Sequence, residues 1–134
     1  MKVYLDDERQ TPDGWHRVYW PEDAITLLKQ GIVTEISLDH DLGDDEHGTG
    51  YDVILWIEEA VATQGFQPTL IRVHSANSST SQKMEFGITN IKRLSMLIEL
   101  GHALLLRKLS YIYNNVYSKN CCYSYRKRYQ LSFV

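Results

Sequence analysis

The chain has 134 residues, a formal net charge of −3 and a hydrophobic fraction of 43%, values typical of one folded domain and not of a disordered segment. The two cysteines, Cys121 and Cys122, are adjacent. Adjacent cysteines rarely bridge each other, so no disulfide framework is expected and a reducing cytoplasm fits. The first residues include no long apolar run, and the apolar stretch 96–106 is interrupted by Glu99 and His102, so we expect neither a signal peptide nor a membrane span.

Charge is distributed unevenly along the chain. Residues 1–60 hold fifteen acidic and four basic side chains, whereas residues 61–134 hold two acidic and ten basic ones. The first half is therefore expected to contain an acidic site, and the second half a basic surface that tolerates anions. A chance distribution of solvated charges would explain the basic half equally well, and the sequence leaves that choice open.

Apolar runs that alternate with turn residues predict strands and helices in alternation through residues 1–73. Pro21 starts a helix that Gly31 ends. Two capping-box patterns, at 49–52 and at 79–82, start two more helices. The expected elements in chain order are strand 2–5, strand 16–20, helix 21–31, strand 33–38, helix 49–65, strand 69–73, a helix that begins at 79–82, and a further helix at 96–109.

The end of the chain has an unusual composition. Residues 111–129 contain six tyrosines, and every charge after Ser118 is positive. Interleaved tyrosine and arginine side chains can bind nucleic acid by stacking and phosphate contact. A poorly ordered basic tail has the same composition and is the commoner case, so it is the interpretation that we favour.

Three of the predicted strands end in side chains that can do chemistry. In open α/β sheets, ligands bind at the edge formed by the carboxyl ends of the strands, so these three ends are expected to converge on one site. The segments that follow the strands are Asp6-Asp7-Glu8, Asp39-His40-Asp41 and His74-Ser75-Ala76-Asn77.

Clustered carboxylates repel one another, so Asp6, Asp7 and Asp39 need a cation or a proton in order to share one cleft. A hard divalent ion with oxygen ligands, Mg²⁺ or Mn²⁺, suits such a site and would stabilise charge on a phosphate oxygen. His40 and His74 stand beside these carboxylates and can exchange protons near neutral pH. The residue types therefore favour chemistry on a phosphate ester.

Each of these residues also has a purely structural interpretation. Asp6 could be an ordinary turn acid, and His74 could be a hydrogen-bonded core residue. Ser75 and Asn77 offer neutral donors for phosphate oxygens, but strand alternation places His74 and Ser75 on opposite faces, so both need not reach the site. The segment 44–47 is expected to be a solvated loop, and the spacing of the acids and histidines matches neither a calcium loop nor a zinc site.

The strand-end segments are similar to those of the receiver domains of two-component signalling, which have an acidic pair, an acceptor aspartate and a Ser-Ala at these places. The closer resemblance is to a divergent branch, the cyclic-phosphate processing receiver-like domains. It covers about residues 1–93 and is carried by Leu5-Asp6-Asp7-Glu8-Arg9, Leu38-Asp39-His40-Asp41-Leu42-Gly43, Gly48-Thr49-Gly50-Tyr51-Asp52 and His74-Ser75-Ala76-Asn77.

The resemblance implies a receiver-like (flavodoxin-like) α/β fold of three layers with a mostly parallel sheet. It predicts a receiver-like domain in residues 1–93, followed in residues 94–134 by a C-terminal helix and a basic, Tyr-rich tail. No apolar run ending in Lys-Pro follows the fourth predicted strand, so whether the C-terminal end of the fold is complete or altered stays open.

The resemblance also implies binding or hydrolysis of a cyclic-phosphate-containing nucleotide or RNA end, here by a Mg²⁺- or Mn²⁺-dependent phosphoesterase with no membrane partner. The predicted roles are metal binding by Asp6, Asp7, Asp39 and Asp41, catalysis by Asp39, His40 and His74, and substrate binding by Arg9, Ser75 and Asn77.

Two other functions are compatible with the same residues. Asp39 could accept a phosphoryl group in a signalling module, although the lysine that receiver domains carry after a fifth strand is not recognisable here. The chain could also be a binding protein without turnover, which recognises a cyclic nucleotide or an RNA end through its basic second half.

Overall fold

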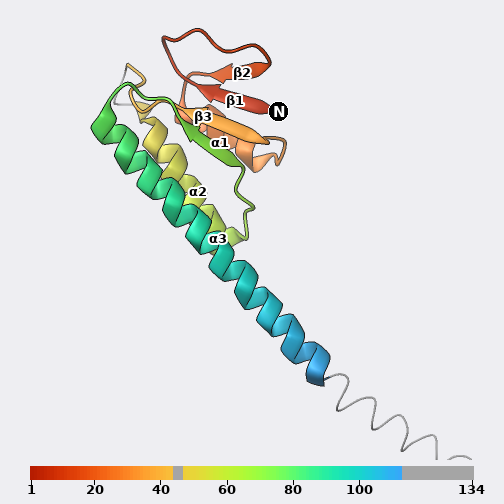
Figure 1. The fold of residues 1–134 in the computed structure, drawn as a ribbon. Helices are drawn as coiled ribbons and strands as arrows, with labels where there is room; N and C mark the ends of the chain where they lie inside the picture. Colours follow the sequence, from red (N-terminus) through yellow and green to blue (C-terminus); the bar gives the residue numbers. More distant parts are fainter. Residues whose placement is uncertain (44–46, 113–134) are drawn as a thin grey trace, which may run out of the picture. The chain divides into compact units, whose positions relative to one another are not determined.

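The structure is a computed structural model that describes residues 1–43 and 47–112 (Figure 1). The chain divides into two compact units, residues 1–96 and residues 97–134, and the first unit holds all four strands. The elements are β1 (Lys2–Leu5), β2 (Trp15–Val18), α1 (Pro21–Lys29), β3 (Glu35–Leu38), α2 (Gly50–Gln64), β4 (Leu70–Val73) and α3 (Ser78–Ile112). The predictions for the acidic loop 44–46 and for the Tyr-rich tail from residue 113 onward lie outside the described residues.

The four strands form one parallel sheet in the order β2-β1-β3-β4. Leu5 of β1 is paired with Leu38 of β3, and Leu38 is paired with Val73 of β4. The three strands therefore end at the same level. Backbone hydrogen bonds extend this register by one residue, because the N–H of Asp39 donates to the carbonyl of Leu5 at 2.9 Å and that of His74 donates to Leu38 at 3.1 Å.

Strand alternation gives the sheet an apolar face and a polar face. In β1, Val3 and Leu5 are fully buried among apolar residues, and Tyr4 between them points to the other side. On that other side Lys2 and Arg72 both pair with the carboxylate of Glu35. We define the polar face by its residues Lys2, Tyr4, Glu35, Ser37 and Arg72.

The first two helices agree with the sequence predictions. Pro21 is the first residue of α1, which has two acids in its first turn. At the start of α2, the backbone N–H and the hydroxyl of Thr49 both donate to Asp52 Oδ2, at 2.7 and 3.1 Å. Gly65 ends α2 in the left-handed region, at a φ of 66°, a conformation that glycine adopts at little cost.

The third helix differs from the prediction in its start and in its length. Its N-terminus is capped by Asn77, whose Oδ1 accepts the backbone N–H groups of Ser79 at 3.1 Å and Thr80 at 3.4 Å. The predicted capping box at 79–82 is therefore wrong. The helix then continues to Ile112, where two helices were predicted, because the segment contains no proline that would interrupt it.

Within the first unit, α3 packs closely against α2. Met84, Ile88 and Ile91, which have the spacing of one helix face, are buried. A Cβ atom on Gly87 would lie 2.6 Å from Cγ2 of Ile54 in α2. The glycine therefore permits an approach of the two helices that a larger residue would prevent.

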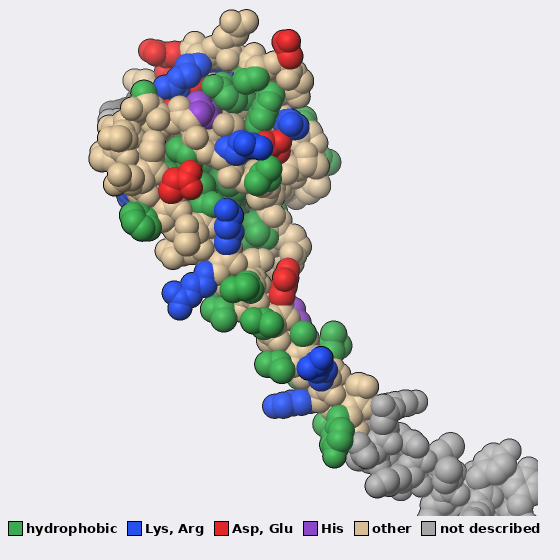
Figure 2. Space-filling view, viewed as in Figure 1, with side chains coloured by type: hydrophobic (Ala, Val, Ile, Leu, Met, Phe, Trp, Pro, Cys, Tyr) green, Lys and Arg blue, Asp and Glu red, His purple; other side chains and the backbone are tan. Residues whose placement is uncertain are grey.

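Within the second unit, the described part of α3 exposes many large apolar side chains, which Figure 2 shows in green along the helix. They are Leu97, Leu100, Leu104, Leu105, Leu106, Leu109, Tyr111 and Ile112. Even so, none of the helices in residues 1–43 and 47–112 is both long enough and apolar enough to cross a bilayer.

β2 and β4 form the two edges of the sheet, and no strand follows β4 in the part of the chain that the structure describes. On β4, Leu70 is 50% exposed and the side chain of Arg72 is 62% exposed. The all-parallel sheet with its three helices is the receiver-like α/β fold that the sequence predicted.

Candidate functional site

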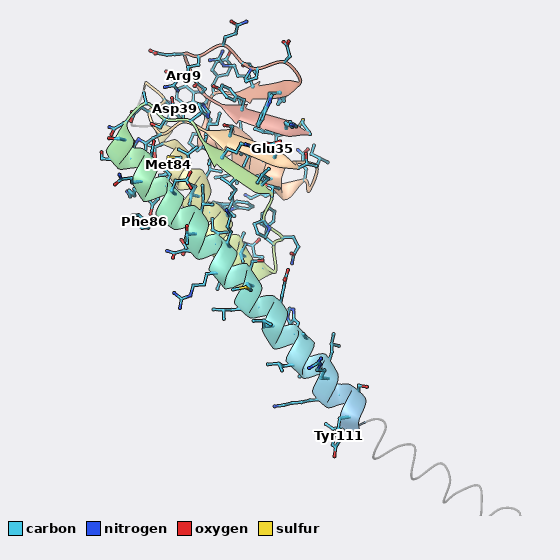
Figure 3. The ribbon with its side chains drawn as sticks, in the orientation of Figure 1. Arg9, Glu35, Asp39, Met84, Phe86 and Tyr111 are labelled. Carbon is cyan, nitrogen blue, oxygen red and sulfur yellow. The ribbon has the colours of Figure 1, made fainter. Side chains whose placement is uncertain are left out.

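Three side chains meet at the carboxyl edge of the sheet. Asp6, Asp39 and His74 each follow the last residue of a strand and, by strand alternation, lie on the same side of the sheet as the polar face. One carboxylate oxygen or ring nitrogen from each lies within 4.8 Å of the other two. Figure 3 shows Asp39 at this edge, with Arg9 reaching it from the loop after β1. The expected convergence of the three strand ends is therefore present in the fold.

Asp6 is fully buried and is surrounded by donors. Its Oδ1 accepts the backbone N–H groups of Glu8 at 2.8 Å and Arg9 at 2.5 Å, and its Oδ2 accepts Nη1 of Arg9 at 3.0 Å. Burial by itself would raise the pKa of this carboxyl, but the hydrogen bonds from Arg9, Glu8 and His74 outweigh it, so the pKa lies below its ordinary value. Asp6 is therefore ionised at neutral pH.

His74 uses both of its ring nitrogens inside the protein. Nε2 lies 3.1 Å from Asp6 Oδ2, and Nδ1 lies 2.7 Å from the hydroxyl of Ser37. An ionised carboxylate can only accept, so Nε2 carries the hydrogen and Nδ1 accepts from Ser37. The ring also stacks on Tyr4, with centroids 4.3 Å apart. Burial lowers the pKa of His74, although the bond to Asp6 opposes this effect, so the net direction favours the neutral imidazole.

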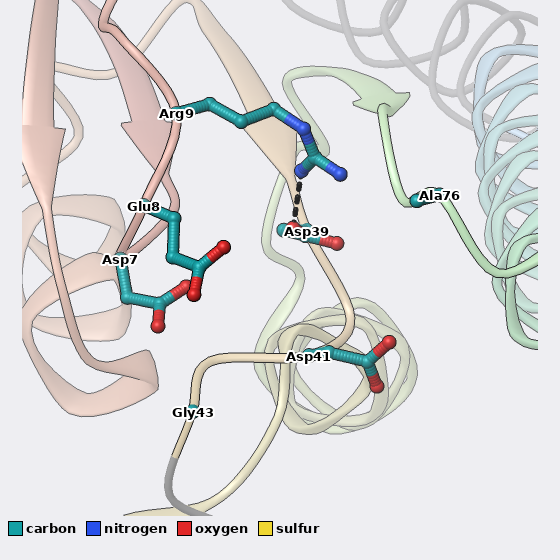
Figure 4. A pocket seen from close by; sticks show the side chains of 7 residues that line it. All are labelled: Asp7, Glu8, Arg9, Asp39, Asp41, Gly43 and Ala76. Carbon is teal, nitrogen blue, oxygen red and sulfur yellow. Dashed lines mark hydrogen bonds and ion pairs between the residues drawn. The ribbon is translucent and has the colours of Figure 1, made fainter.

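Arg9 is the cation that joins two of the strand ends. Its Nη1 donates to Asp39 Oδ2, the contact that Figure 4 marks with a dashed line. The same Nη1 also donates to Asp6 Oδ2 at 3.0 Å. The hydrogen bonds to Asp6 and then to Asp39 raise the pKa of the guanidinium. The sequence predicted Arg9 as a substrate-binding residue, and the structure shows it in contact with both carboxylates.

A cleft of about 290 Å³ opens beside these side chains. It is lined by Asp7, Glu8, Arg9, Asp39, Asp41, Gly43 and Ala76, the residues drawn in Figure 4. Gly43 has a φ of 73°, and a Cβ there would lie 2.7 Å from Asp7 Oδ2, so a glycine at this position leaves room for the carboxylate. Two of the predicted metal ligands, Asp7 and Asp41, therefore border the same cleft as Asp39.

His40 pairs with the carboxylate next to it in the sequence. Its Nδ1 lies 2.7 Å from Asp41 Oδ1, which favours the tautomer with hydrogen on Nδ1 and a lone pair on Nε2. Its backbone N–H donates to Asp39 Oδ1 at 2.7 Å, and its carbonyl accepts the N–H of Gly50 at 3.2 Å. A Cβ on Gly50 would lie 1.8 Å from the carbonyl oxygen of Asp39, so the start of α2 packs directly against the site.

Ser75 and Asn77, the predicted phosphate donors, have local partners. The Oγ of Ser75 lies 3.4 Å from the backbone nitrogen of Asn77, and the side-chain oxygen of Asn77 caps α3. Ala76 between them lines the cleft, so this segment borders the site. A contact of either side chain with a phosphate stays a prediction.

Sequence reasoning missed the supporting residues. Ser37 is buried within β3 and holds His74, and a polar residue between the apolar residues Ile36 and Leu38 was the available indication of a buried hydrogen bond. Arg17 donates from Nε to the backbone carbonyl of Asp6 at 2.9 Å and has Nη2 3.6 Å from Asp6 Oδ1. Its place beside Asp6 follows from the pairing of β2 with β1, which periodicity alone does not reveal.

The ligand atoms at this edge suit a hard divalent cation, provided that the side chain of Arg9 can move. Carboxylate oxygens are the ligands that Mg²⁺ and Mn²⁺ prefer, and Asp6, Asp39 and His74 bring their ligand atoms close enough to share one ion. The guanidinium of Arg9, however, already contacts Asp39 Oδ2. An ion bound through that oxygen therefore requires Arg9 to move.

Comparison with known proteins identifies the relationship of the chain. No curated protein and no solved structure matches it. The family model described as the cyclic-phosphate processing receiver domain matches residues 1–90, a range that includes all four strands and every strand-end residue of the site. The chain therefore belongs to the cyclic-phosphate processing receiver domain family.

Proposed function

We propose that the protein hydrolyses the cyclic phosphate of a nucleotide or of an RNA end with the help of a divalent cation at the acidic cleft. The observation that carries the proposal is the meeting of Asp6, Asp39 and His74 within 4.8 Å at the edge of the sheet, beside a cleft lined by further carboxylates. The family description supports the substrate class.

The proposed metal ligands are Asp7, Asp39 and Asp41, which line the cleft, together with Asp6, which is buried beside Asp39. Bound Mg²⁺ or Mn²⁺ would supply Lewis-acid stabilisation of the charge that develops on the phosphate oxygens. Arg9 also lines the cleft and is the proposed contact for a phosphate oxygen, since a guanidinium matches the geometry of phosphate.

Hydrolysis adds the oxygen of one water molecule to phosphorus and breaks one ester bond of the ring, which leaves a phosphomonoester and a hydroxyl group. A base must take a proton from the water, and an acid must return one to the departing oxygen. His40 is the proposed proton-transfer group, because Asp41 holds its Nδ1–H at 2.7 Å and leaves Nε2 to accept and return the proton.

His74, the second predicted acid–base residue, is proposed for a different role. Its ring nitrogens are engaged by Ser37 and Asp6, so an exchange with substrate would first have to break one of these hydrogen bonds. We therefore assign His74 to holding the Asp6 carboxylate in place.

The purified protein, supplied with Mg²⁺ or Mn²⁺, tests the proposal on 2′,3′- and 3′,5′-cyclic nucleotides, with the phosphomonoester product followed by ³¹P NMR. We expect turnover that Asp39→Asn abolishes and that His40→Gln lowers by about 10²- to 10⁴-fold, the usual contribution of general acid–base catalysis. A lack of product with every cyclic phosphate, or equal turnover by Asp39→Asn, would contradict the proposal.

The same samples separate the two other functions. Tight binding of a cyclic nucleotide without product would indicate a binding protein. A gain in intact mass of one phosphoryl group after incubation with acetyl phosphate, absent in Asp39→Asn, would indicate a phospho-accepting receiver.

A further inference from the structure

Asp6 and Asp39 share one counter-ion. The side chain of Asp6 is fully buried and that of Asp39 is 8% exposed, whereas the side chain of Arg9, which contacts both, is 39% exposed. Neighbouring buried carboxylates cannot both stay ionised without a nearby positive charge. In this arrangement the positive charge that contacts both carboxylates is the guanidinium of Arg9, whose side chain also lines the cleft (Figure 4).

The two carboxylates depend on the Arg9 side chain to different degrees. Asp39 accepts a backbone N–H from His40 at 2.7 Å, and in the described residues no other basic side chain forms an ion pair with it. Asp6 has more partners than Asp39. Without the Arg9 guanidinium, its carboxylate still accepts the backbone N–H groups of Glu8 and Arg9 and the Nε2–H of His74. The guanidinium of Arg17 adds a positive charge 3.6 Å away, as an ion pair and not as a hydrogen bond.

This asymmetry shows which carboxylate is available for exchange. If the Arg9 guanidinium leaves, Asp6 keeps enough donors to stay ionised and in place, whereas Asp39 is left as a carboxylate in need of a cation. Asp39 also faces the cleft, whereas Asp6 is not among the lining residues. An ion that enters the cleft therefore meets Asp39 with Arg9 already bound to it.

We propose that Arg9 is an exchangeable counter-ion, which a divalent cation entering the cleft displaces from Asp39 and which then turns to the phosphate of the substrate. This inference rests on the proposed function for the identity of the cation. The backbone N–H of Arg9 stays bonded to Asp6 at 2.5 Å, so the side chain exchanges partners while its main chain is held at the site.

Competition of this kind lowers the apparent affinity for the metal, because binding must first break the contact between Arg9 and Asp39. Loss of the guanidinium should therefore tighten metal binding. Loss of any nearby positive charge also tightens it through the long-range field. Arg17 provides the matched control, since it pairs with Asp6 at 3.6 Å and forms no ion pair with Asp39 in the described residues.

Isothermal titration calorimetry of the full chain with Mn²⁺ measures the competition without reference to activity. We expect Arg9→Gln to bind Mn²⁺ about tenfold or more tightly than the wild type, and Arg17→Gln to change the affinity by less than about threefold. Arg9→Lys keeps a positive charge on a flexible stem and should stay within about threefold of the wild type.

Equal Mn²⁺ affinity in the wild type and in Arg9→Gln would overturn the exchange and would leave the metal site of the proposed function intact. A matching gain in Arg17→Gln would also overturn it, because the effect would then be general electrostatics. A lack of Mn²⁺ binding by every protein would overturn the exchange and the metal-dependent function together.

A measurement on the wild type keeps the proposal testable if a variant fails to fold. The arginine side-chain NMR signals, with Arg9 assigned through its backbone, are followed as Mg²⁺ is added to the full chain. Displacement predicts a shift of the Arg9 guanidinium signals at the concentrations where Mg²⁺ binds, with smaller changes at Arg17. Arg9 signals that do not change when Mg²⁺ saturates the protein would overturn the proposal.

Discussion

At the scale of the residue, His74 links a buried hydroxyl to a buried carboxylate. Ser37, His74 and Asp6 form one hydrogen-bonded chain with distances of 2.7 and 3.1 Å. Every donor in it has an acceptor when the imidazole is neutral, which fits a pKa that burial lowers. Protonation of the ring would remove the acceptor for Ser37 and place a charge in a mostly buried position. The hydrogen bonds among these three side chains are therefore sensitive to pH.

The sign of this sensitivity follows from the direction of the shift. Because the pKa of His74 is lower in the folded protein than its ordinary value of 6.5, the unfolded chain binds the proton more readily as the pH falls below that value. The free energy of unfolding should therefore be highest above pH 6.5 and should decrease below it. Urea titrations in the presence of a chelator, at several pH values down to about 5, measure this decrease.

The variant His74→Gln should show a weaker dependence on pH over the same range. His16→Gln is the control, since His16 is exposed and its loss should leave the dependence of the wild type unchanged. Equal pH dependence in the wild type and in His74→Gln would show that another group is responsible.

Gly50 provides a second prediction about a single residue. A Cβ at this position would lie 1.8 Å from the carbonyl oxygen of Asp39, so Gly50→Ala must displace either the start of α2 or the backbone of the site. We expect a loss of about 2–4 kcal/mol in the free energy of unfolding, measured by urea denaturation.

Gly101→Ala is the matched control for this change. Gly101 lies within α3, and a Cβ there would meet no atom within 4 Å. The same substitution should stabilise the protein by up to about 1 kcal/mol through helix propensity. A small effect of Gly50→Ala, comparable to that of Gly101→Ala in size, would mean that α2 does not constrain Asp39.

The acids of the site could be predicted from the sequence, but their partners could not. Asp6 and Asp39 stand directly after apolar runs, and parallel strands bring such positions to one edge. The contact of Arg9 with both depends on the path of the loop after β1, and the contact of Ser37 with His74 depends on the register of β3 against β4. Neither the path nor the register is visible in a periodic pattern.

At the scale of the element, the N-terminal cap of α3 allows two roles of Asn77, helix capping and phosphate binding, to be tested separately. Asn77 was predicted to bind phosphate, and its Oδ1 accepts two backbone N–H groups at the start of α3. Asn77→Ala should lower the free energy of unfolding by about 1 kcal/mol, whereas Asn77→Asp keeps the capping oxygen and should cost little. Thermal and urea unfolding of the two variants measure the difference.

If Asn77 also donates to a phosphate through its amide, Asn77→Asp should weaken the binding of a cyclic nucleotide, because a carboxylate repels the anion. Equal nucleotide affinity in Asn77→Asp and in the wild type would restrict Asn77 to its role as a cap.

The strands and helices that were predicted correctly are those whose ends have clear signals in the sequence. The four strands and the first two helices have clear ends, marked by Pro21, by Thr49 with Asp52 and by Gly65. The region around residue 94 changes in composition but has no residue that stops a helix. Two helices were therefore expected where α3 is continuous, because a change in apolar pattern reflects a change of surroundings and not of backbone conformation.

At the scale of the whole molecule, the two units differ in how they bury apolar surface. The first unit, residues 1–96, contains the sheet, α1, α2 and the buried residues of α3. We expect a fragment of residues 1–96 to unfold cooperatively within about 5 °C of the full chain, and to bind less of the dye ANS. Circular dichroism and dye fluorescence check these outcomes, and a fragment without a cooperative transition would show that the remainder of the chain is required for folding.

A divalent cation should stabilise the whole molecule if it binds the site in the folded protein and does not bind the unfolded chain. At a concentration of one hundred times its dissociation constant, the gain is about 2.7 kcal/mol in the free energy of unfolding. Thermal unfolding with increasing Mg²⁺ or Mn²⁺ should show the rise for the wild type and a much smaller one for Asp39→Asn. Identical curves for the two proteins would place the ion elsewhere.

Among the residues that the structure describes, β4 is an edge strand, and this affects how the sheet meets other chains. An edge strand offers unpaired N–H and C=O groups on which a further strand, including one from another molecule, can add, and such addition is a common route to aggregation. β4 has four residues, and the exposed guanidinium of Arg72 stands on it beside Glu35. A short, charged border of this kind resists uncontrolled growth, so replacing Arg72 with an apolar residue would remove a safeguard of solubility without touching the cleft.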